Sequence, residues 1–298
     1  MQYPGSTFTE AAYRQHLQHL VEQALQEDIG SGDHSTLSCI PADAVGTAVL
    51  KIKEAGVLAG VVVAQFIFQL VAPDAEIIIH KADGAYMQPG ELAFTVRTKV
   101  HTLLSCERLV LNIMQRMSGI ATLTKQYTER LQGYTTQLLD TRKTTPNFRL
   151  LEKEAVRIGG GINHRFALYD MIMLKDNHID FAGGIIPAIN KAYAYVQTLQ
   201  QPLKIEVETR SLQDVALVCK HAEGKVFRIM LDNFTPEQVA EAVQLIDGRF
   251  ETEASGGINL NTIEAYAATG VTYVSVGGLI HQARSVDLSL KAIEVSHE

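Results

Sequence analysis

Cationic side chains are concentrated in one stretch of this 298-residue chain, from Arg142 to His178. The stretch holds seven lysine or arginine residues and four acidic ones, a net charge of +3, although the whole chain carries a net charge of −7. A basic stretch in an acidic protein favours a pocket for a small, multiply charged anion over a surface for a polyanion. We therefore expect the chemistry of the protein to be centred on this stretch.

Two kinds of position can be separated within the stretch. Five charged residues lie at helical spacings and predict a solvated helix: Arg149, Glu152, Lys153, Glu154 and Arg157. The other cations come in pairs where an apolar segment ends: Arg142 and Lys143, His164 and Arg165, and Lys175 and His178. Parallel α/β folds expose their functional side chains at such strand ends.

The elements that would position these pairs follow a regular pattern from Thr136 onward. Apolar strands are predicted to end near Asp140, Leu174, Val207, Leu231, Ala254 and Val276, and helices are predicted at 185–199, 212–221, 236–246 and 262–268. Six such units indicate a parallel α/β barrel, two strands short of the usual eight. The barrel is therefore expected to be open, with something else covering its gap.

The first hundred residues mix strands and helices without a repeat and predict an α+β domain. Strands are expected at 45–52, 75–81 and 92–96, an amphipathic helix at 12–27, and a half-buried helix of about twelve residues within 56–72. A long helix is expected to begin at Ser105 as its N-cap and to close at Gly133. On pattern alone, Arg108 is a solvated residue of its first turn, where a cation opposes the helix dipole.

Polar groups suited to a sugar phosphate come at the remaining strand ends. They are Glu206, Glu208, Asp232, Ser255-Gly256-Gly257 and Gly277-Gly278. Glycines let backbone amides approach a phosphate, which barrel enzymes commonly bind in their last two loops. The carboxylates of Glu208 and Asp232 suit a magnesium ion or ribose hydroxyls. One Gly-Gly pair could be an ordinary turn, but two pairs after consecutive strands favour a phosphate site.

The composition and the N-terminal sequence indicate where in the cell the protein is located. Three widely separated cysteines, Cys39, Cys106 and Cys219, indicate reduced thiols and neither a disulfide framework nor a zinc site. The segment MQYPGSTFTEAAY has no basic start and no apolar run, so we expect no export signal and a cytoplasmic location. The most apolar segment, 56–72, is interrupted by Gly60 and shorter than the ~20 residues of a membrane span, so no membrane association is expected.

Eight motifs together resemble the quinolinate phosphoribosyltransferase family, the carboxylating nicotinate-nucleotide pyrophosphorylases of NAD synthesis. In chain order they are ERLVLNIMQRMSGIAT, DTRKTTP, EKEAVRIGGGINHR, LYDMIMLKDNHI, IEVE, IMLDN, EASGGI and SVGG. The resemblance implies an α/β N-terminal domain (residues 1–116, with 283–298 packing back on it) and an open barrel of six or seven strands (117–282). It also implies a homodimer in which the N-terminal domain of one subunit closes the barrel of the other.

The resemblance also implies roles for individual residues. Arg142, His164 and Arg165 would bind the two carboxylates of quinolinate, with Arg108 of the partner subunit reaching in; Lys143, Lys175 and His178 would surround phosphoribosyl pyrophosphate and the pyridine ring. Glu208 and Asp232 would hold magnesium and ribose, and Lys143, Glu208 and Asp232 would be catalytic. Ser255, Gly256, Gly257, Gly277 and Gly278 would bind the 5′-phosphate. No organic cofactor is implied.

Two departures from the family pattern are visible. The segment CKHAEGKVFR is a few residues longer than expected, which should affect a helix and not the site. Gly278 stands where alanine is usual, a change that should still admit phosphate.

Two other classes of function share some of these features. A lyase or isomerase of phosphosugars could use Lys143 or Lys175 as a Schiff-base amine, but it would leave the arginines Arg142 and Arg165 unexplained. A nucleic-acid-binding module could use the basic stretch, but the net charge of −7 and the neighbouring carboxylates disfavour it.

Overall fold

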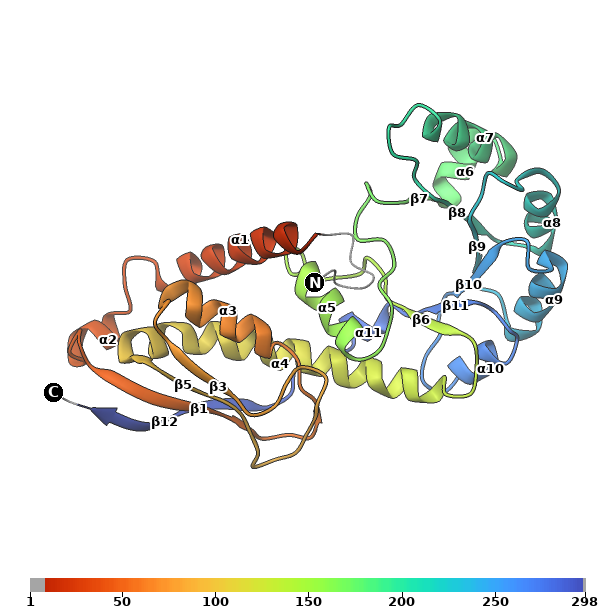
Figure 1. Cartoon of the computed structure of the whole chain (residues 1–298). Helices are drawn as coiled ribbons and strands as arrows, with labels where there is room; N and C mark the ends of the chain where they lie inside the picture. The colour runs from red at the N-terminus through yellow and green to blue at the C-terminus, as the bar shows by residue number, and fades with distance from the viewer. Residues whose placement is uncertain (1–8, 297–298) are drawn as a thin grey trace. The chain divides into compact units, whose positions relative to one another are not determined.

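Residues 9–296 are described by a computed structural model, which divides into two compact units (Figure 1). Unit 1 comprises residues 1–125, 144–160 and 279–298, and unit 2 comprises residues 126–143 and 161–278. Residues 1–8, which begin the segment where no export signal is expected, lie outside the described part. The predicted domain limits at residues 116 and 282 stay a prediction.

An antiparallel four-stranded sheet in the order β12-β1-β5-β3 organises unit 1. Its strands are β1 (Val45–Ile52), β3 (Glu76–Ile79), β5 (Leu92–Lys99) and β12 (Leu288–Ser296), and a small second sheet pairs β2 (Gly56–Val57) with β4 (Tyr86–Met87). The helices are α1 (Glu10–Ile29), α2 (His34–Cys39), α3 (Val61–Val71), α5 (Arg149–Ile158) and most of the long α4 (Val100–Arg130). Figure 1 shows the C-terminal strand β12 beside β1, its antiparallel partner. The predicted α+β character is confirmed.

Helix α3 supplies part of the core of unit 1. Val63, Ile67 and Phe68 are buried on one face, and the Phe68 ring meets the Phe94 ring of β5 edge to face, with centroids 6.2 Å apart. Gln69 on the opposite face is exposed, as predicted for a half-buried helix. Within residues 9–296, no helix is long and apolar enough to cross a membrane.

Helix α4 begins earlier than predicted. It starts at Val100, directly after β5, so Ser105 is an interior residue whose hydroxyl donates to the His101 carbonyl oxygen at 2.8 Å. Arg108 lies in the third turn and not in the first, so the helix dipole does not oppose its charge there. The prediction of Ser105 as N-cap, and the dipole argument built on it, are therefore wrong.

Helix α5 is also different from its prediction, because two of its charged residues are buried. Glu152 is fully buried and Lys153 is 3% exposed, so the prediction of a solvated helix is wrong for both. Glu152 accepts hydrogen bonds from Nε and Nη2 of Arg116 on α4, at 3.1 and 2.9 Å, and from the Thr145 amide at 2.8 Å. Arg116 also donates to the carbonyl oxygens of Ile280 and Ala283. One buried ion pair thus ties α4, α5, the Thr145 turn and the segment before β12 together.

We expect Glu152→Gln to destabilise the fold by about 3–5 kcal/mol, because it leaves the Arg116 guanidinium without its buried carboxylate. Glu154→Gln is the matched control, since Glu154 lies on the same helix and pairs with Arg157 at its partly exposed edge. The control should cost no more than about 1 kcal/mol. Unfolding in urea, followed by circular dichroism, compares the two variants; equal losses would contradict the assigned role of Glu152.

Unit 2 is built on a six-stranded parallel sheet in the order β6-β11-β10-β9-β8-β7. The strands are β6 (Gln137–Leu139), β7 (Ile172–Leu174), β8 (Ile205–Thr209), β9 (Arg228–Asp232), β10 (Glu251–Ser255) and β11 (Tyr273–Ser275). Among the described residues no ladder joins the edge strands β6 and β7, so the barrel is open. All six predicted strand ends, and the open barrel of six strands, are confirmed.

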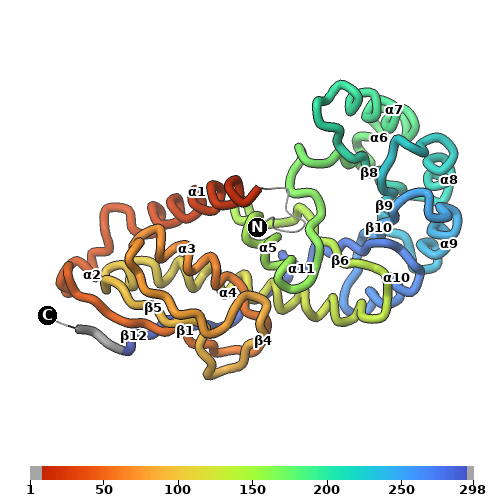
Figure 2. Tube along the Cα trace, viewed as in Figure 1, coloured from red at the N-terminus to blue at the C-terminus, as the bar shows by residue number. Residues whose placement is uncertain are grey.

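The helices of unit 2 follow the strands in alternation and lie outside the sheet (Figure 2). They are α6 (Asp176–Ala182), α7 (Ile185–Val196), α8 (Leu212–His221), α9 (Pro236–Ile246) and α10 (Ile263–Ala267). The short α11 (Gly278–His281) begins at the last residue of unit 2 and continues into unit 1. Side-chain caps fix several starts: the Ser211 hydroxyl accepts from the Asp214 amide, and the Thr235 hydroxyl accepts from the Gln238 amide. The predicted helices at 212–221 and 236–246 are reproduced residue for residue.

Candidate active site

The predicted site residues of unit 2 gather at one edge of its sheet. All six strands are parallel, so their carboxyl ends meet at the same edge. Site residues follow or end each strand: Arg142 and Lys143 (β6), Lys175 and His178 (β7), Glu208 (β8), Asp232 (β9), Ser255 to Gly257 (β10), and Gly277 and Gly278 (β11). His164 and Arg165 lie in the loop between α5 and β7.

Arg142 and Arg165 form a pair of guanidinium groups. Burial lowers the pKa of Arg165, and the positive charge of Arg142 lowers it further, as expected for two cations near each other. Arg165 Nη1 donates to the Met171 carbonyl oxygen at 3.0 Å, which fixes the end of the side chain. Two partly buried guanidiniums of like charge favour the binding of an anion with more than one negative group.

The Lys143 side chain is exposed. Its main-chain amide donates to the Thr141 hydroxyl at 3.0 Å, a local bond that shapes the turn between Arg142 and Thr145. An exposed ammonium in this turn is free to neutralise a highly charged group arriving from solvent.

Lys175 and Glu208 form an ion pair across neighbouring strands β7 and β8. Lys175 Nζ lies 3.3 Å from Glu208 Oε2, and the Glu208 side chain is 8% exposed whereas that of Lys175 is 48% exposed. His178 lies one turn into α6, and its Nδ1 accepts from the Lys175 main-chain amide at 3.1 Å. The ion pair gives this edge of the sheet both a cation for a leaving anion and a carboxylate for a developing positive charge.

Asp232 ends β9 next to a tight contact between two motifs. Asn233 has a left-handed φ of 59° and donates its main-chain amide to the Ser255 carbonyl oxygen at 2.8 Å. A Cβ on Gly256, whose φ is 100°, would lie 2.3 Å from the Asn233 side-chain oxygen, so only glycine fits. The Asp232 carboxylate accepts from Asn233 Nδ2 at 2.6 Å, so Asn233 links it to the glycine turn that follows β10.

The two glycine pairs differ in their surroundings. Gly257 has a φ of 65° and no atom near the position of a Cβ, so its backbone is open. Gly277 and Gly278 lead into α11. Both turns follow neighbouring strands at the same edge of the sheet, and glycine, which has no side chain, suits a phosphate bound by backbone amides.

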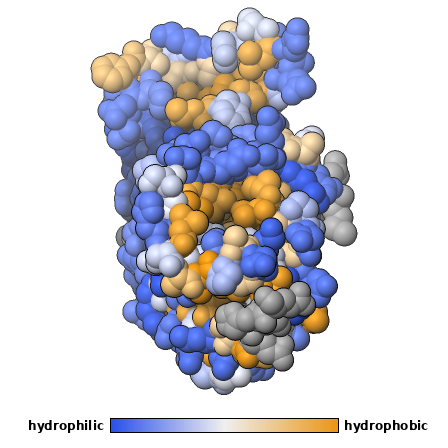
Figure 3. All heavy atoms as spheres, turned by 90° about the vertical axis from the view of Figure 1, so that its left-hand side faces the viewer, coloured by the Kyte–Doolittle hydropathy of each residue, from blue (hydrophilic) through white to orange (hydrophobic). Residues whose placement is uncertain are grey.

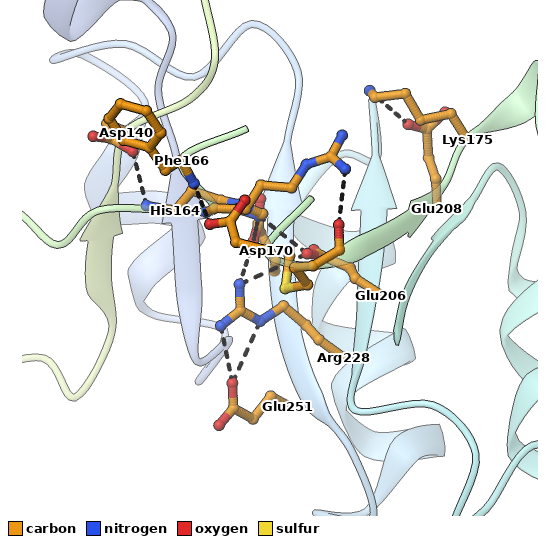
Figure 4. Close-up of polar contacts among 12 residues, drawn as sticks. Asp140, His164, Phe166, Asp170, Lys175, Glu206, Glu208, Arg228 and Glu251 are labelled. Carbon is orange, nitrogen blue, oxygen red and sulfur yellow. Dashed lines mark hydrogen bonds and ion pairs between the residues drawn. The ribbon is translucent and has the colours of Figure 1, made fainter. Parts of the chain in front are cut away.

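The buried environment of His164 was not predicted from the sequence. Its Nε2 lies 3.0 Å from Glu206 Oε2 and 3.2 Å from Glu253 Oε2, and both carboxylates are fully buried (Figure 4). Its main-chain amide donates to Asp140 at 2.8 Å, and its Nδ1 accepts from the Arg165 amide at 2.7 Å. Nδ1 thus has a hydrogen-bond partner, and Nε2 faces two carboxylates at ion-pair distance, so the predicted contact of His164 with a substrate carboxylate stays a prediction.

Burial and neighbouring charges both change the pKa values of this cluster. Burial lowers the pKa of His164, but the nearby Glu206 and Glu253 carboxylates raise it more. Burial and the neighbouring Glu253 raise the pKa of Glu206 to about 7. Nδ1 of His164 accepts from the Arg165 amide and therefore carries no proton in this geometry, so the ring proton is on Nε2, which faces the two carboxylates. A second proton, on Nδ1, would displace the Arg165 amide.

Arg228 and Glu253 were missed by the sequence reasoning. The segment CKHAEGKVFR runs from the end of α8 to the start of β9, and its last residue, Arg228, contacts Glu251 and Glu253 inside unit 2. Whether its extra length affects only a helix stays a prediction. A signal was available, because β10 (ETEAS) alternates charged residues in a strand predicted to be buried, and a buried charge requires a partner.

Two groups could be considered for a metal ion. Ligand atoms of His164, Glu206 and Glu253 lie within 4.8 Å of one another, but the Arg228 guanidinium is 2.9 Å from Glu253 and already supplies the positive charge. Glu208 and Asp232 are hard oxygen ligands at the ends of neighbouring strands. Mg²⁺ is commonly held by one or two carboxylates, waters and substrate phosphates, so the second pair fits magnesium better.

Arg108 lies in unit 1, on α4, and its side chain is exposed. Among the described residues no carboxylate lies within ion-pair distance of it, and Glu107 beside it lines a small cavity of unit 1. An exposed cation of this kind is available to a second molecule.

Comparison with known proteins gives a consistent result. Family models described as quinolinate phosphoribosyl transferase, N-terminal domain and C-terminal domain, match residues 33–118 and 120–291. The chain is 42% identical over 288 residues to the chloroplastic nicotinate-nucleotide pyrophosphorylase (carboxylating) of Arabidopsis thaliana, covering 92% of this chain and 82% of the relative. It is 39% identical to the probable nicotinate-nucleotide pyrophosphorylase (carboxylating) of Bacillus subtilis, covering 92% of each chain. The crystal structure of NadC from Streptococcus pyogenes is similar with a TM-score of 0.88 and 40% identity, covering 98% of this chain and 99% of that one.

Proposed function

This chain belongs to the quinolinate phosphoribosyl transferase family, and from that premise we propose that it transfers the phosphoribosyl group of phosphoribosyl pyrophosphate to quinolinate, with loss of one carboxylate. The products are nicotinate mononucleotide, pyrophosphate and CO2, in the synthesis of NAD. The observation that carries the proposal is that a guanidinium pair, a lysine–glutamate pair, an aspartate and two glycine turns belong to the same end of one parallel sheet.

Quinolinate is a planar dicarboxylate, and Arg142 and Arg165 are the groups that would bind it. A guanidinium donates two parallel hydrogen bonds to a carboxylate, which an ammonium cannot do. Partial burial strengthens these bonds by excluding water. Binding of the dianion also removes the mutual repulsion of the two arginines.

Transfer breaks the bond between the ribose anomeric carbon and the pyrophosphate oxygen and forms a bond from that carbon to the ring nitrogen. The anomeric carbon becomes cationic in the transition state, so Glu208 and Asp232 would stabilise it electrostatically. Lys143 and Lys175 would neutralise the pyrophosphate that leaves. Glu208 and Asp232 would hold magnesium together with the substrate, and the ion would supply further neutralisation of phosphate charge.

Loss of CO2 follows from the charge on the ring. Once ribosylated, the ring nitrogen is positive, and the electron pair of the broken bond between the ring and the adjacent carboxylate is stabilised next to it. The same carbon then takes up a proton. The protein mainly positions and desolvates charged groups in this scheme, and no organic cofactor takes part.

The two glycine turns would receive the 5′-phosphate. Ser255, Gly256 and Gly257 follow β10, and Gly277 and Gly278 follow β11, the neighbouring strand. Backbone amides at these turns suit a phosphate because they add partial positive charge without side-chain bulk. A Schiff-base lyase is not favoured, since Lys175 is ion-paired and half exposed and Lys143 is exposed, whereas such a lysine needs a desolvated pocket.

The active unit is proposed to be a homodimer in which Arg108 of one subunit completes the site of the other. In support, unit 1 has an apolar cavity of about 60 Å³ lined by residues of β1, α4 and β12, including Leu104, which is 41% exposed. Figure 3 shows apolar residues gathered into an area with hydrophilic residues around it. Apolar areas of this kind are typical of protein interfaces. Arg108 is four residues from Leu104 and so on the same face of α4.

The proposed location is the cytoplasm. It rests on the reduced thiols expected from three separate cysteines, all of them free in the structure. The Arabidopsis thaliana relative is named as chloroplastic, so fractionation of the cells that express the protein is the measurement that decides.

The proposed reaction is tested by mixing the protein with quinolinate and phosphoribosyl pyrophosphate in the presence of Mg²⁺. Pyrophosphate should appear only when both substrates are present, and nicotinate mononucleotide should appear in equal amount. Replacement of quinolinate by nicotinate, which lacks one carboxylate, should abolish turnover. Equal turnover of the two acids would contradict the proposed use of an arginine pair.

We expect Arg142→Lys to weaken quinolinate binding by about 1.5–3 kcal/mol, or roughly 10- to 150-fold, since it keeps the charge but loses the bidentate geometry. Isothermal titration with quinolinate measures the change. Arg157→Lys is the matched control, because Arg157 lies in the same basic stretch but pairs with Glu154 on α5. Binding by Arg142→Lys within about twofold of the control would rule out bidentate recognition.

A further inference from the structure

A layer of buried charges lies inside unit 2, and the proposed reaction gives no role to its central member, Arg228. Arg228 is on β9, between the strands that carry Glu206 and Glu253. Its Nη1 donates to Glu253 Oε2 at 2.9 Å, and its Nη2 donates to Glu251 Oε2 at 3.0 Å. The guanidinium also stacks on the Tyr273 ring, with its carbon 4.2 Å from the centroid. Hydrogen bonds on two sides and an aromatic face thus fix the plane of the guanidinium.

The next contact in this layer is between Glu253 and His164. Oε2 of Glu253, the atom that accepts from Arg228, lies 3.2 Å from His164 Nε2. Glu206 Oε2 lies 3.0 Å from the same nitrogen and 3.8 Å from Arg228 Nη1. Figure 4 shows Arg228 reaching from Glu251 toward the histidine and its carboxylates. Arg228 therefore holds in place one of the two carboxylates that face the imidazole ring at ion-pair distance.

The orientation of the ring reaches the predicted substrate site through one more bond. The Arg165 amide donates to His164 Nδ1 at 2.7 Å, so a rotated ring would release the main chain of Arg165. The guanidinium end of the Arg165 side chain is held by Met171, whose carbonyl oxygen accepts from Arg165 Nη1 at 3.0 Å. Arg165 is thus fixed at both ends, and one of these ends depends on His164.

We propose that Arg228 is a positioning residue, which acts through Glu253 and His164 to hold Arg165 in the orientation that receives a carboxylate of the substrate. This inference rests on the proposed function for the identity of that substrate, quinolinate. Stability alone is a poor explanation for the layer, because replacing a buried ion network with apolar residues is often neutral or stabilising. A network that orients one binding group gives a reason to keep the charges.

Kinetics of Arg228→Gln in the full-length protein test the inference. We expect the KM for quinolinate to rise by about 10- to 100-fold, the range for loss of a group that orients a binding histidine, and the KM for phosphoribosyl pyrophosphate to stay within about twofold. Glu251→Gln is the matched control. Glu251 is the outer partner of Arg228, its own side chain is 35% exposed, and its replacement leaves the contact of Arg228 with Glu253 intact. Both KM values of the control should stay within about twofold of wild type. Arg228→Lys, which keeps the charge but not the planar fork, should fall between the two.

A second readout does not depend on the reaction. In protein labelled with ¹⁵N-histidine, the ring-nitrogen signals of His164, assigned with His164→Gln, should shift in Arg228→Gln and stay in place in Glu251→Gln. An unchanged His164 signal in Arg228→Gln, or an equal rise of both KM values, would overturn the positioning role. Absence of pyrophosphate release from the wild type would instead overturn the proposed function. The nitrogen spectra would still show whether Arg228 positions the His164 ring. If Arg228→Gln fails to fold, Arg228→Lys supplies both comparisons.

Discussion

Replacement of Glu208 or Asp232 by alanine is expected to lower turnover by about 100- to 1,000-fold while the affinity for quinolinate stays within about threefold. These carboxylates end neighbouring strands β8 and β9 and are assigned to the sugar and the metal, whereas the arginines Arg142 and Arg165 are assigned to the pyridine dicarboxylate. A group that acts only on charge developed in the transition state changes turnover and not ground-state binding.

The control for this prediction is Glu223→Ala, which removes an exposed carboxylate of unit 2 in the turn between α8 and β9, before the start of β9 and not at its carboxyl end. Steady-state kinetics give the turnover number, and calorimetric titration gives the affinity for quinolinate. Equal losses in turnover and in quinolinate affinity for Glu208→Ala would mean that this carboxylate contacts the acid and not the sugar.

Mixed dimers should recover activity that two inactive parents lack. Arg108→Ala and Lys143→Ala are each expected to lower activity by about 100-fold or more as homodimers, because each removes a cation assigned to the bound anions. In a mixed dimer with sites completed in trans, one site receives both substitutions and the other neither. Random exchange makes half of the dimers mixed, so about a quarter of the wild-type activity per subunit should return, as the twofold symmetry of an isologous dimer requires.

A second pair of variants provides the control for the mixed dimers. Lys143 and Glu208 both belong to unit 2 and are assigned to the same site of the same chain. Mixing Lys143→Ala with Glu208→Ala should therefore restore nothing, since every site of every dimer carries one substitution. Native mass spectrometry confirms that subunits have exchanged. Recovery in the control, or no recovery with Arg108→Ala, would contradict a site completed by the partner subunit.

The barrel could be predicted from the sequence because its signals are local. Strands β6, β7, β9 and β11 are short apolar runs with a polar residue at or just after their ends, and helices such as α8 and α9 start with Ser211 and Thr235 as caps. The start of α4 carried no such signal. β5 passes into it without a glycine or proline, and the Val100 amide is satisfied by the Ala44 carbonyl oxygen at 2.8 Å. Ser105 was therefore mistaken for a cap.

Non-local ion pairs account for the other differences between prediction and structure. Glu152 has the spacing of a solvated helix residue, and only the fold shows that its partner is Arg116 on another helix. His164, Glu206, Glu253 and Arg228 come from three strands and a loop, and no spacing along the chain links them. The glycine turns were easier to predict, because the close contact of Gly256 with Asn233 leaves room for no other residue type.

Release of labelled CO2 tests most directly whether this chain couples phosphoribosyl transfer to decarboxylation. Quinolinate carrying ¹³C in the carboxylate next to the ring nitrogen would be turned over with phosphoribosyl pyrophosphate, and labelled CO2 and pyrophosphate would be measured together. The proposed mechanism predicts one labelled CO2 for each pyrophosphate, and none from quinolinate labelled in the other carboxylate. Pyrophosphate released without labelled CO2 would contradict it, because the ribosylated ring nitrogen would then not be serving as the electron sink for the adjacent carboxylate.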